Sequence, residues 1–154
     1  MNWEKLKSHV YHQDGSLRDI YIRDVTQDEW RRWAEYVSSN YPVDFKLGGT
    51  HAGNKINFDS VVTYWQDSNQ ENPTASIRLG TIIVNTFFFD ENEIENDITP
   101  SEIKTLEDHH RLLEYLRNIS ILLNRPVELT EESYQDLKEV LIVVDGEKVT
   151  FKDR

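Results

Sequence analysis

The stretch ASIRLGTIIVNTFFFDENEIENDI, residues 75–98, carries three consecutive patterns that are typical of antiparallel strands. β-Branched and aromatic residues are frequent in it, and turn-forming residues divide it at Gly80 and at residues 90–92. The middle segment is almost entirely apolar or β-branched, which predicts the buried centre of a sheet. We therefore expect a β-meander whose strands are Ala75–Leu79, Thr81–Phe89 and Glu93–Ile98.

The last of these segments alternates apolar and acidic residues. Ile94 and Ile98 face one side of the predicted strand, and its carboxylates face the other side. Two further carboxylates lie in the adjoining turn. We expect these acidic side chains to be solvated and to form the candidate partner-binding site, which consists of Asp90, Glu91, Glu93, Glu95 and Asp97.

Two segments with helical periodicity flank the meander. Thr26–Asn40 begins with a capping-box pattern and places Trp30 and Trp33 on one face, which predicts that both are core residues. Leu106–Asn124 follows Thr105 as a predicted N-cap, and its wide apolar stripe is typical of a helix lying across a sheet. The expected fold class is α+β: a mainly antiparallel, meander-rich sheet with two principal helices packed on one face.

Shorter patterns predict further strands and one long loop. Ser16–Val25 is predicted to pair with Val10–His12 as a hairpin across the turn at Asp14 and Gly15. Most of Gly48–Thr74 is predicted to be loop, in which Asp59 caps a short helix. The remaining predicted elements are strands at Val43–Leu47 and Val127–Leu129, an acidic connector at Thr130–Lys138 and a hairpin at Val140–Phe151.

Acidic residues are concentrated in the C-terminal part of the chain. Of the 28 Asp and Glu residues, 17 lie in residues 90–154 against eight Lys and Arg, so this part carries −9 of the formal net charge of −11. Like charges repel, and a fold keeps them where solvent or a cationic partner screens them. The surface is therefore either a solvated face that aids solubility or a docking surface for a basic partner. Nucleic acid is disfavoured as a partner because phosphate binding needs a basic patch.

Length and composition place further limits on the class of protein. A chain of 154 residues is expected to form a single α+β domain, 1–154, with a core of its own. The absence of Cys excludes a disulfide scaffold and a thiolate metal site. The segment after Met1 has no apolar h-region, and the apolar runs are too short to span a bilayer. We expect a cytoplasmic protein with no membrane association.

Two motifs resemble ligand sites without completing them. Residues 48–55 are glycine-rich like a P-loop, but Asn54 separates Gly53 from Lys55 and Ile56 replaces the required hydroxyl. Glu107, His110 and Glu114 share a helix face, yet this is half of a di-iron motif and no second copy exists. The chain also has no nucleophile elbow and no H-E-x-x-H motif. The sequence therefore predicts no catalytic residues, no metal and no cofactor.

Three segments together resemble a group of short, uncharacterised bacterial proteins that share a DGSLRDIY-type N-terminal segment and the same order of elements. They are Asp14–Ile22, Phe87–Phe89 leading to Glu93–Ile98, and Leu112–Thr130. The likeness carries over no catalytic residues to this chain. The small, acidic, cysteine-free α+β character is also similar to that of immunity proteins of bacterial toxin systems.

These observations favour a non-enzymatic acidic binding protein, and most specifically an immunity protein that neutralises a basic bacterial toxin. Acidic groups would steer such a protein quickly onto a basic target. Two alternatives stay open. One is a small enzyme or ligand-binding protein whose pocket lies under the 48–74 loop, since long loops in compact domains are often functional. The other is a bacterial housekeeping protein whose acidity serves solubility alone.

Overall fold

The computed structural model describes residues 2–132 and 139–152. Its helices are α1 (Trp3–His9), α2 (Gln27–Asn40), α3 (Phe58–Gln66) and α4 (Leu106–Leu123), with a 3-10 turn at Pro100–Glu102. Its strands are β1 (Arg18–Ile22), β2 (Val43–Leu47), β3 (Thr50–Gly53), β4 (Pro73–Leu79), β5 (Ile82–Thr86), β6 (Ile94–Ile98), β7 (Val127–Glu131), β8 (Val140–Asp145) and β9 (Lys148–Phe151). The predicted α+β class is confirmed.

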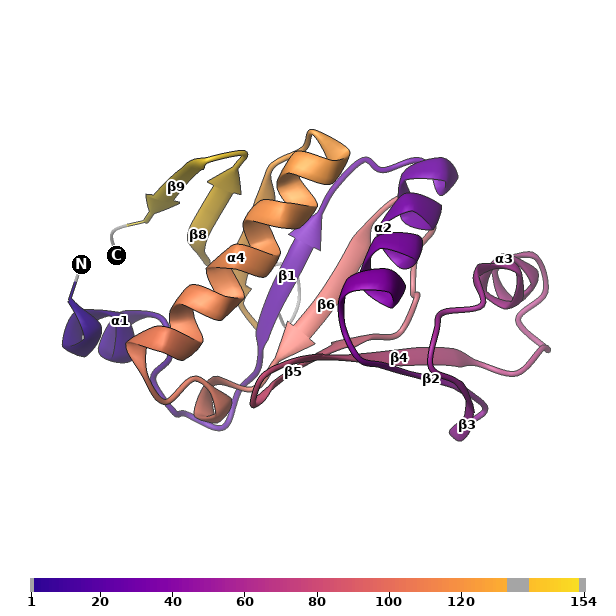
Figure 1. Cartoon of the computed structure of the whole chain (residues 1–154), viewed down its shortest axis with the longest axis horizontal. Coiled ribbons are helices and arrows are strands. Elements are labelled where there is room, and N and C mark those ends of the chain that lie inside the picture. The colour runs from indigo at the N-terminus through magenta and orange to yellow at the C-terminus, as the bar shows by residue number, and fades with distance from the viewer. Residues whose placement is uncertain (1, 133–138, 153–154) are drawn as a thin grey trace.

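In the described ranges all nine strands join one antiparallel sheet in the order β3-β2-β4-β5-β6-β1-β7-β8-β9. The predicted meander is confirmed as β4-β5-β6, and the predicted C-terminal hairpin is confirmed as β8-β9. The acidic connector predicted at Thr130–Lys138 lies mostly outside the described residues. Strand β1 is inserted between β6 and β7, although both come much later in the chain. Figure 1 shows β1 in the middle of the sheet.

The predicted hairpin between Val10–His12 and β1 is wrong. Residues 3–9 form helix α1 instead, and the segment after it is held by the fully buried guanidinium of Arg18. That group donates to the backbone oxygens of Val10 at 2.7 Å and of His12 at 2.8 Å. Because a side chain satisfies these carbonyls, the segment needs no strand partner, and both edges of β1 remain available to β6 and β7.

The segment 48–74 contains more regular structure than the predicted loop. Gly48 and Gly49 adopt positive φ angles and turn β2 into β3, so the paired glycines serve a hairpin. A short helix follows as predicted, but its N-cap is Asn57, whose side chain accepts from the Ser60 amide at 3.3 Å. The sequence signal was weak because α3 is short and only Phe58 and Val61 in it are buried.

Helices α2 and α4 lie side by side on the same side of the sheet in Figure 1. Both begin with the capping boxes expected from Thr26 and Thr105. Trp33 on α2 donates from Nε1 to the hydroxyl of Tyr115 on α4 at 3.2 Å, and this hydroxyl donates to Asn96 on β6 at 2.8 Å. A chain of buried hydrogen bonds therefore links both helices to the sheet.

We predict that Trp33→Ala destabilises the protein by about 3–5 kcal/mol, the range for deleting a large buried aromatic side chain. Trp33 has 0% exposure, and its loss also removes the donor to the Tyr115 hydroxyl, which keeps only its bond to Asn96. Urea denaturation followed by circular dichroism measures the change. Ile121→Ala on α4 is the matched control, because Ile121 is 54% exposed and its truncation should cost no more than about 0.5 kcal/mol. Equal midpoints for the two variants would contradict the packing described above.

Candidate functional site

The central strands present their carboxylates on the side of the sheet that points away from the core. On β6, Ile94, Asn96 and Ile98 are buried, and the acidic residues between them are half-buried on the opposite side. This alternation confirms the facing predicted from the sequence. We call this side of the sheet the outer face, and its central residues are Asn85 on β5, Glu95 and Asp97 on β6, Asp19 and Tyr21 on β1, and Glu128 on β7.

A row of polar side chains crosses the outer face from strand to strand. Ser76 on β4 donates to Asn85 at 3.0 Å, and Asn85 donates to Asp97 at 3.2 Å. The strand register then places Asp97 directly opposite Asp19 on β1. Carboxylates in directly opposed positions of an antiparallel pair repel each other. The row therefore brings two carboxylates together at the centre of the sheet, and Asp19 also accepts from the Tyr21 hydroxyl at 3.4 Å.

A second row lies one pleat further along and is centred on Tyr21. Its hydroxyl donates to Glu95 at 2.7 Å. Arg23 lies 4.7 Å above the Tyr21 ring, donates to Glu128 at 2.7 Å and approaches Glu93 at 3.6 Å. Among the residues that the structure describes, one arginine thus lies close to two carboxylates of this row.

The electrostatics of this cluster follow from burial and from neighbouring negative charge. Burial raises the pKa of Asp97 above its ordinary value, and the charges of Glu95 and Glu132 raise it further. Burial also raises the pKa of Tyr21, as do its hydrogen bond to Glu95 and the nearby carboxylates. Tyr21 therefore stays protonated and remains a donor. The surface offers acceptor oxygens suited to Lys and Arg side chains.

The structure places the predicted partner-binding residues in two groups. Asp90 and Glu91 are exposed in the turn before β6. Glu93, Glu95 and Asp97 are half-buried and have Arg23, Tyr21 and Asn85 as their respective partners, so the expectation that they are solvated is wrong. The reason is that β1 pairs alongside β6. The sequence analysis assigned no site role to the residues that complete the surface, which are Asp19, Tyr21, Arg23, Asn85 and Glu128.

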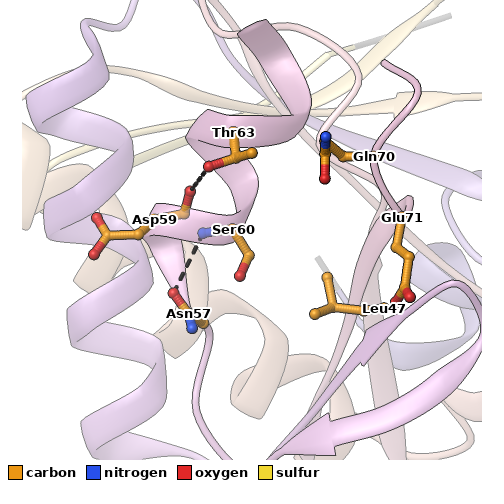
Figure 2. A pocket seen from close by; sticks show the side chains of 7 residues that line it. All are labelled: Leu47, Asn57, Asp59, Ser60, Thr63, Gln70 and Glu71. Atoms are coloured by element: carbon orange, nitrogen blue, oxygen red, sulfur yellow. Dashed lines mark hydrogen bonds between the residues drawn. The ribbon is translucent and has the colours of Figure 1, made fainter. Parts of the chain in front are cut away.

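A hollow of about 450 Å³ opens within the segment that the sequence analysis considered as a ligand pocket. Figure 2 shows α3 on one side of it and Gln70, Glu71 and Leu47 on the other. It is lined by Leu47, Asn57, Asp59, Ser60, Thr63, Gln70 and Glu71. Most of these side chains are exposed, and these seven include two carboxylates but no His, Lys or Arg. The hollow suits a small polar or cationic ligand better than an anion.

Two residues in or beside the incomplete metal motif, Glu107 and His109, already have partners within the protein. His109 is buried and hydrogen-bonded to the Tyr11 hydroxyl, and burial lowers its pKa to about 4. Glu107 is bound by Arg111 at 2.8 Å. Within residues 2–132 and 139–152, no group of three or more His, Cys, Asp or Glu side chains is arranged to hold a metal ion. None of the helices described in these ranges has the length and apolar character needed to cross a membrane.

Comparison of the chain with protein-family models, with curated proteins and with solved structures found no match. The function must therefore be argued from the outer face and the hollow themselves.

We predict that Asp97→Asn raises the melting temperature at pH 7. The folded-state pKa of Asp97 is raised, so its ionisation costs stability above that pKa, and a neutral amide removes this cost while it can still accept from Asn85. The advantage over wild type should shrink as the pH falls through the raised pKa of Asp97, because the wild-type carboxyl then takes up its proton. Differential scanning calorimetry across this range measures it. Asp145→Asn, at an exposed position, is the control, and an equal gain there would refute the assignment.

Proposed function

We propose that the protein is a non-enzymatic binding protein that holds a basic protein partner against its outer face. More specifically, the protein would be an immunity protein that neutralises a basic bacterial toxin in the cytoplasm. The observation that carries it is the placement of Glu95 and Asp97 on the outer face of β6, in the strand that follows the exposed turn residues Asp90 and Glu91.

One-sided packing of the two principal helices supports this choice of surface. Helices α2 and α4 pack on one side of the sheet, and Trp30 and Trp33 of α2 have 0% exposure there. The outer face of β6 carries polar and acidic side chains at the alternate positions instead. A broad twisted sheet presents many side chains from rigid strands, which suits recognition of a folded protein.

The electrostatic cost of the outer face also supports a binding role. Burial and repulsion from Glu95 and Glu132 raise the pKa of Asp97, so ionisation of this half-buried carboxyl destabilises the free protein. Solubility alone is served equally well by exposed carboxylates that do not oppose each other. Lys and Arg side chains of a partner would reduce this repulsion. Binding would then recover part of the free energy that the repulsion costs the free protein.

The hollow beside α3 supports a second candidate, a ligand-binding protein or small enzyme that takes a small polar or cationic ligand. Glu71 would receive the positive charge, whereas the Asp59 carboxylate points away from the hollow and lies 3.6 Å from Arg31. Several of its polar groups are already satisfied within α3, since Asn57 accepts from the Ser60 amide and Thr63 donates to the Asp59 carbonyl. The outer face is therefore the stronger proposal.

The direct test of the immunity role is co-expression. The gene neighbourhood in the source genome is searched for a toxin gene, and the encoded basic toxin domain is expressed in bacteria with and without this protein. We expect growth only in the presence of the protein, together with a stable complex in size-exclusion chromatography. The absence of a neighbouring toxin gene, or killing that this protein does not prevent, would refute the immunity role.

We predict that Glu91→Lys combined with Glu95→Gln slows association with that toxin domain by at least about fivefold at low salt. Glu95→Gln keeps an acceptor for Tyr21, so the fold should be retained. The salt dependence of the association rate should also become shallower, because fewer charges steer the encounter. Stopped-flow fluorescence measures both quantities.

The matched control makes the same change in net charge on the helical side of the molecule. Glu35 on α2 and Glu114 on α4 are both exposed, so Glu35→Lys combined with Glu114→Gln should leave association within about twofold of wild type. If both double variants slow association equally, net charge rather than the outer face governs binding, and the proposed surface is wrong.

A further inference from the structure

The loop between β5 and β6 is held in place by the buried Trp30 and the partly buried Trp65. Trp65 on α3 donates from its indole to the backbone oxygen of Phe88 at 2.8 Å. Trp30 on α2 donates in the same way to the backbone oxygen of Asp90 at 3.1 Å. The two bonds fall on either side of Phe89. The backbone at this residue is therefore fixed from both directions by side chains of the core.

Further contacts fix the conformation of the same loop. Phe88 has φ of 56°, a left-handed conformation that bulky residues rarely adopt, and its ring is buried against Trp30 at a centroid separation of 5.4 Å. The Asp90 side chain accepts from the Asn92 amide at 2.8 Å, and the Asn92 backbone oxygen accepts from the Val25 amide at 3.0 Å. Core packing and hydrogen bonds together maintain a backbone that would otherwise relax.

This rigid loop exposes an aromatic side chain. Phe89 is 72% exposed, the largest exposure among the large hydrophobic residues that the structure describes. Its ring stacks on that of Phe87 with centroids 5.5 Å apart and planes inclined by 20°. Burial continues to alternate along residues 82–88, so Phe87 lies on the outer face with Asn85, opposite the buried Phe88. Because the Phe89 ring stacks on Phe87, it lies on the outer-face side of the sheet.

The charges around Phe89 determine what could cover it. Asp90 and Glu91 follow it directly, and Glu93 comes shortly after. A second copy of this chain would bring the same carboxylates face to face, and each copy carries a formal net charge of −11. Like-charge contacts across an interface are unfavourable, so self-association through this loop is opposed. A cationic surface is the occupant that satisfies both the exposed ring and its acidic surroundings.

We propose that Phe89, supported by Phe87, inserts into an apolar recess bordered by Lys or Arg on the basic protein partner. This inference rests on the proposed function and adds the position of the binding hot spot. Aromatic residues are enriched at the centres of protein interfaces, and a few such side chains carry most of the binding energy. A residue whose backbone is already fixed before binding loses little conformational entropy when the partner covers its side chain.

The test uses the full-length protein and the partner obtained by co-expression. If gene neighbourhood supplies no toxin, the partner is the protein that photo-crosslinks to p-benzoylphenylalanine at position 89 in the native cells, identified by mass spectrometry and then purified. Phe89→Ala should weaken its equilibrium binding by about 30-fold or more. The loss should fall mainly on the dissociation rate, with the salt dependence unchanged, because no charge is altered. Phe89→Leu should recover part of the affinity.

The control and the opposing outcomes separate this inference from the proposed function. Ile121→Ala removes another exposed apolar side chain, on α4, and should leave binding unchanged. If Phe89→Ala binds like wild type while Glu91→Lys with Glu95→Gln is impaired, the hot spot is refuted and the acidic docking surface stands. If neither variant affects binding, both proposals fail. Absence of a crosslink at position 89, or a wild-type dimer in sedimentation velocity that Phe89→Ala abolishes, would also overturn the inference.

Discussion

The pairing of β1 with both β6 and β7 is the constraint on which the sheet depends. Without it, the meander β4-β5-β6 and the C-terminal strands β7-β8-β9 would be separate antiparallel units. Every residue of β1 is buried, including Arg18 and Asp19, so this short strand has little freedom to shift register. Arg18 adds to this by holding the backbone of the preceding segment to the strand. A single central strand therefore joins the two halves of the fold.

The same pairing creates the charged surface. Register between β1 and β6 opposes Asp19 to Asp97 and sets Tyr21 beside Glu95, while β7 brings Glu128 to Arg23. The inner side of these strands is mainly aliphatic, and it also contains the buried side chains of Arg18 and Asn96. This strand arrangement buries apolar side chains in the core on one side of the sheet. On the other side of the sheet it brings carboxylates close together. The proposal of a basic partner rests on these neighbouring carboxylates.

The aromatic core has a second role at the edge of this surface. Trp30 and Trp65 pack against each other with ring centroids 5.4 Å apart, and both indole nitrogens donate to the loop that carries Phe89. Buried indole N–H groups need acceptors, and the backbone of this loop provides them. Packing in the core and the geometry of the exposed ring are consequently coupled. A substitution in the core would reach the candidate interface through these bonds.

The sequence by itself determined the local elements with strong periodicity. Capping boxes at Thr26 and Thr105, the burial of Trp30 and Trp33, the meander, the C-terminal hairpin and the facing of Glu93, Glu95 and Asp97 all follow from short-range patterns. Only the tertiary structure decided that β1 pairs with β6 and β7, that these carboxylates gain partners, and that Phe89 is fixed between two tryptophan bonds. Strand pairing between distant segments leaves no periodic signal in the sequence, because it depends on which edges remain available once the whole sheet has assembled.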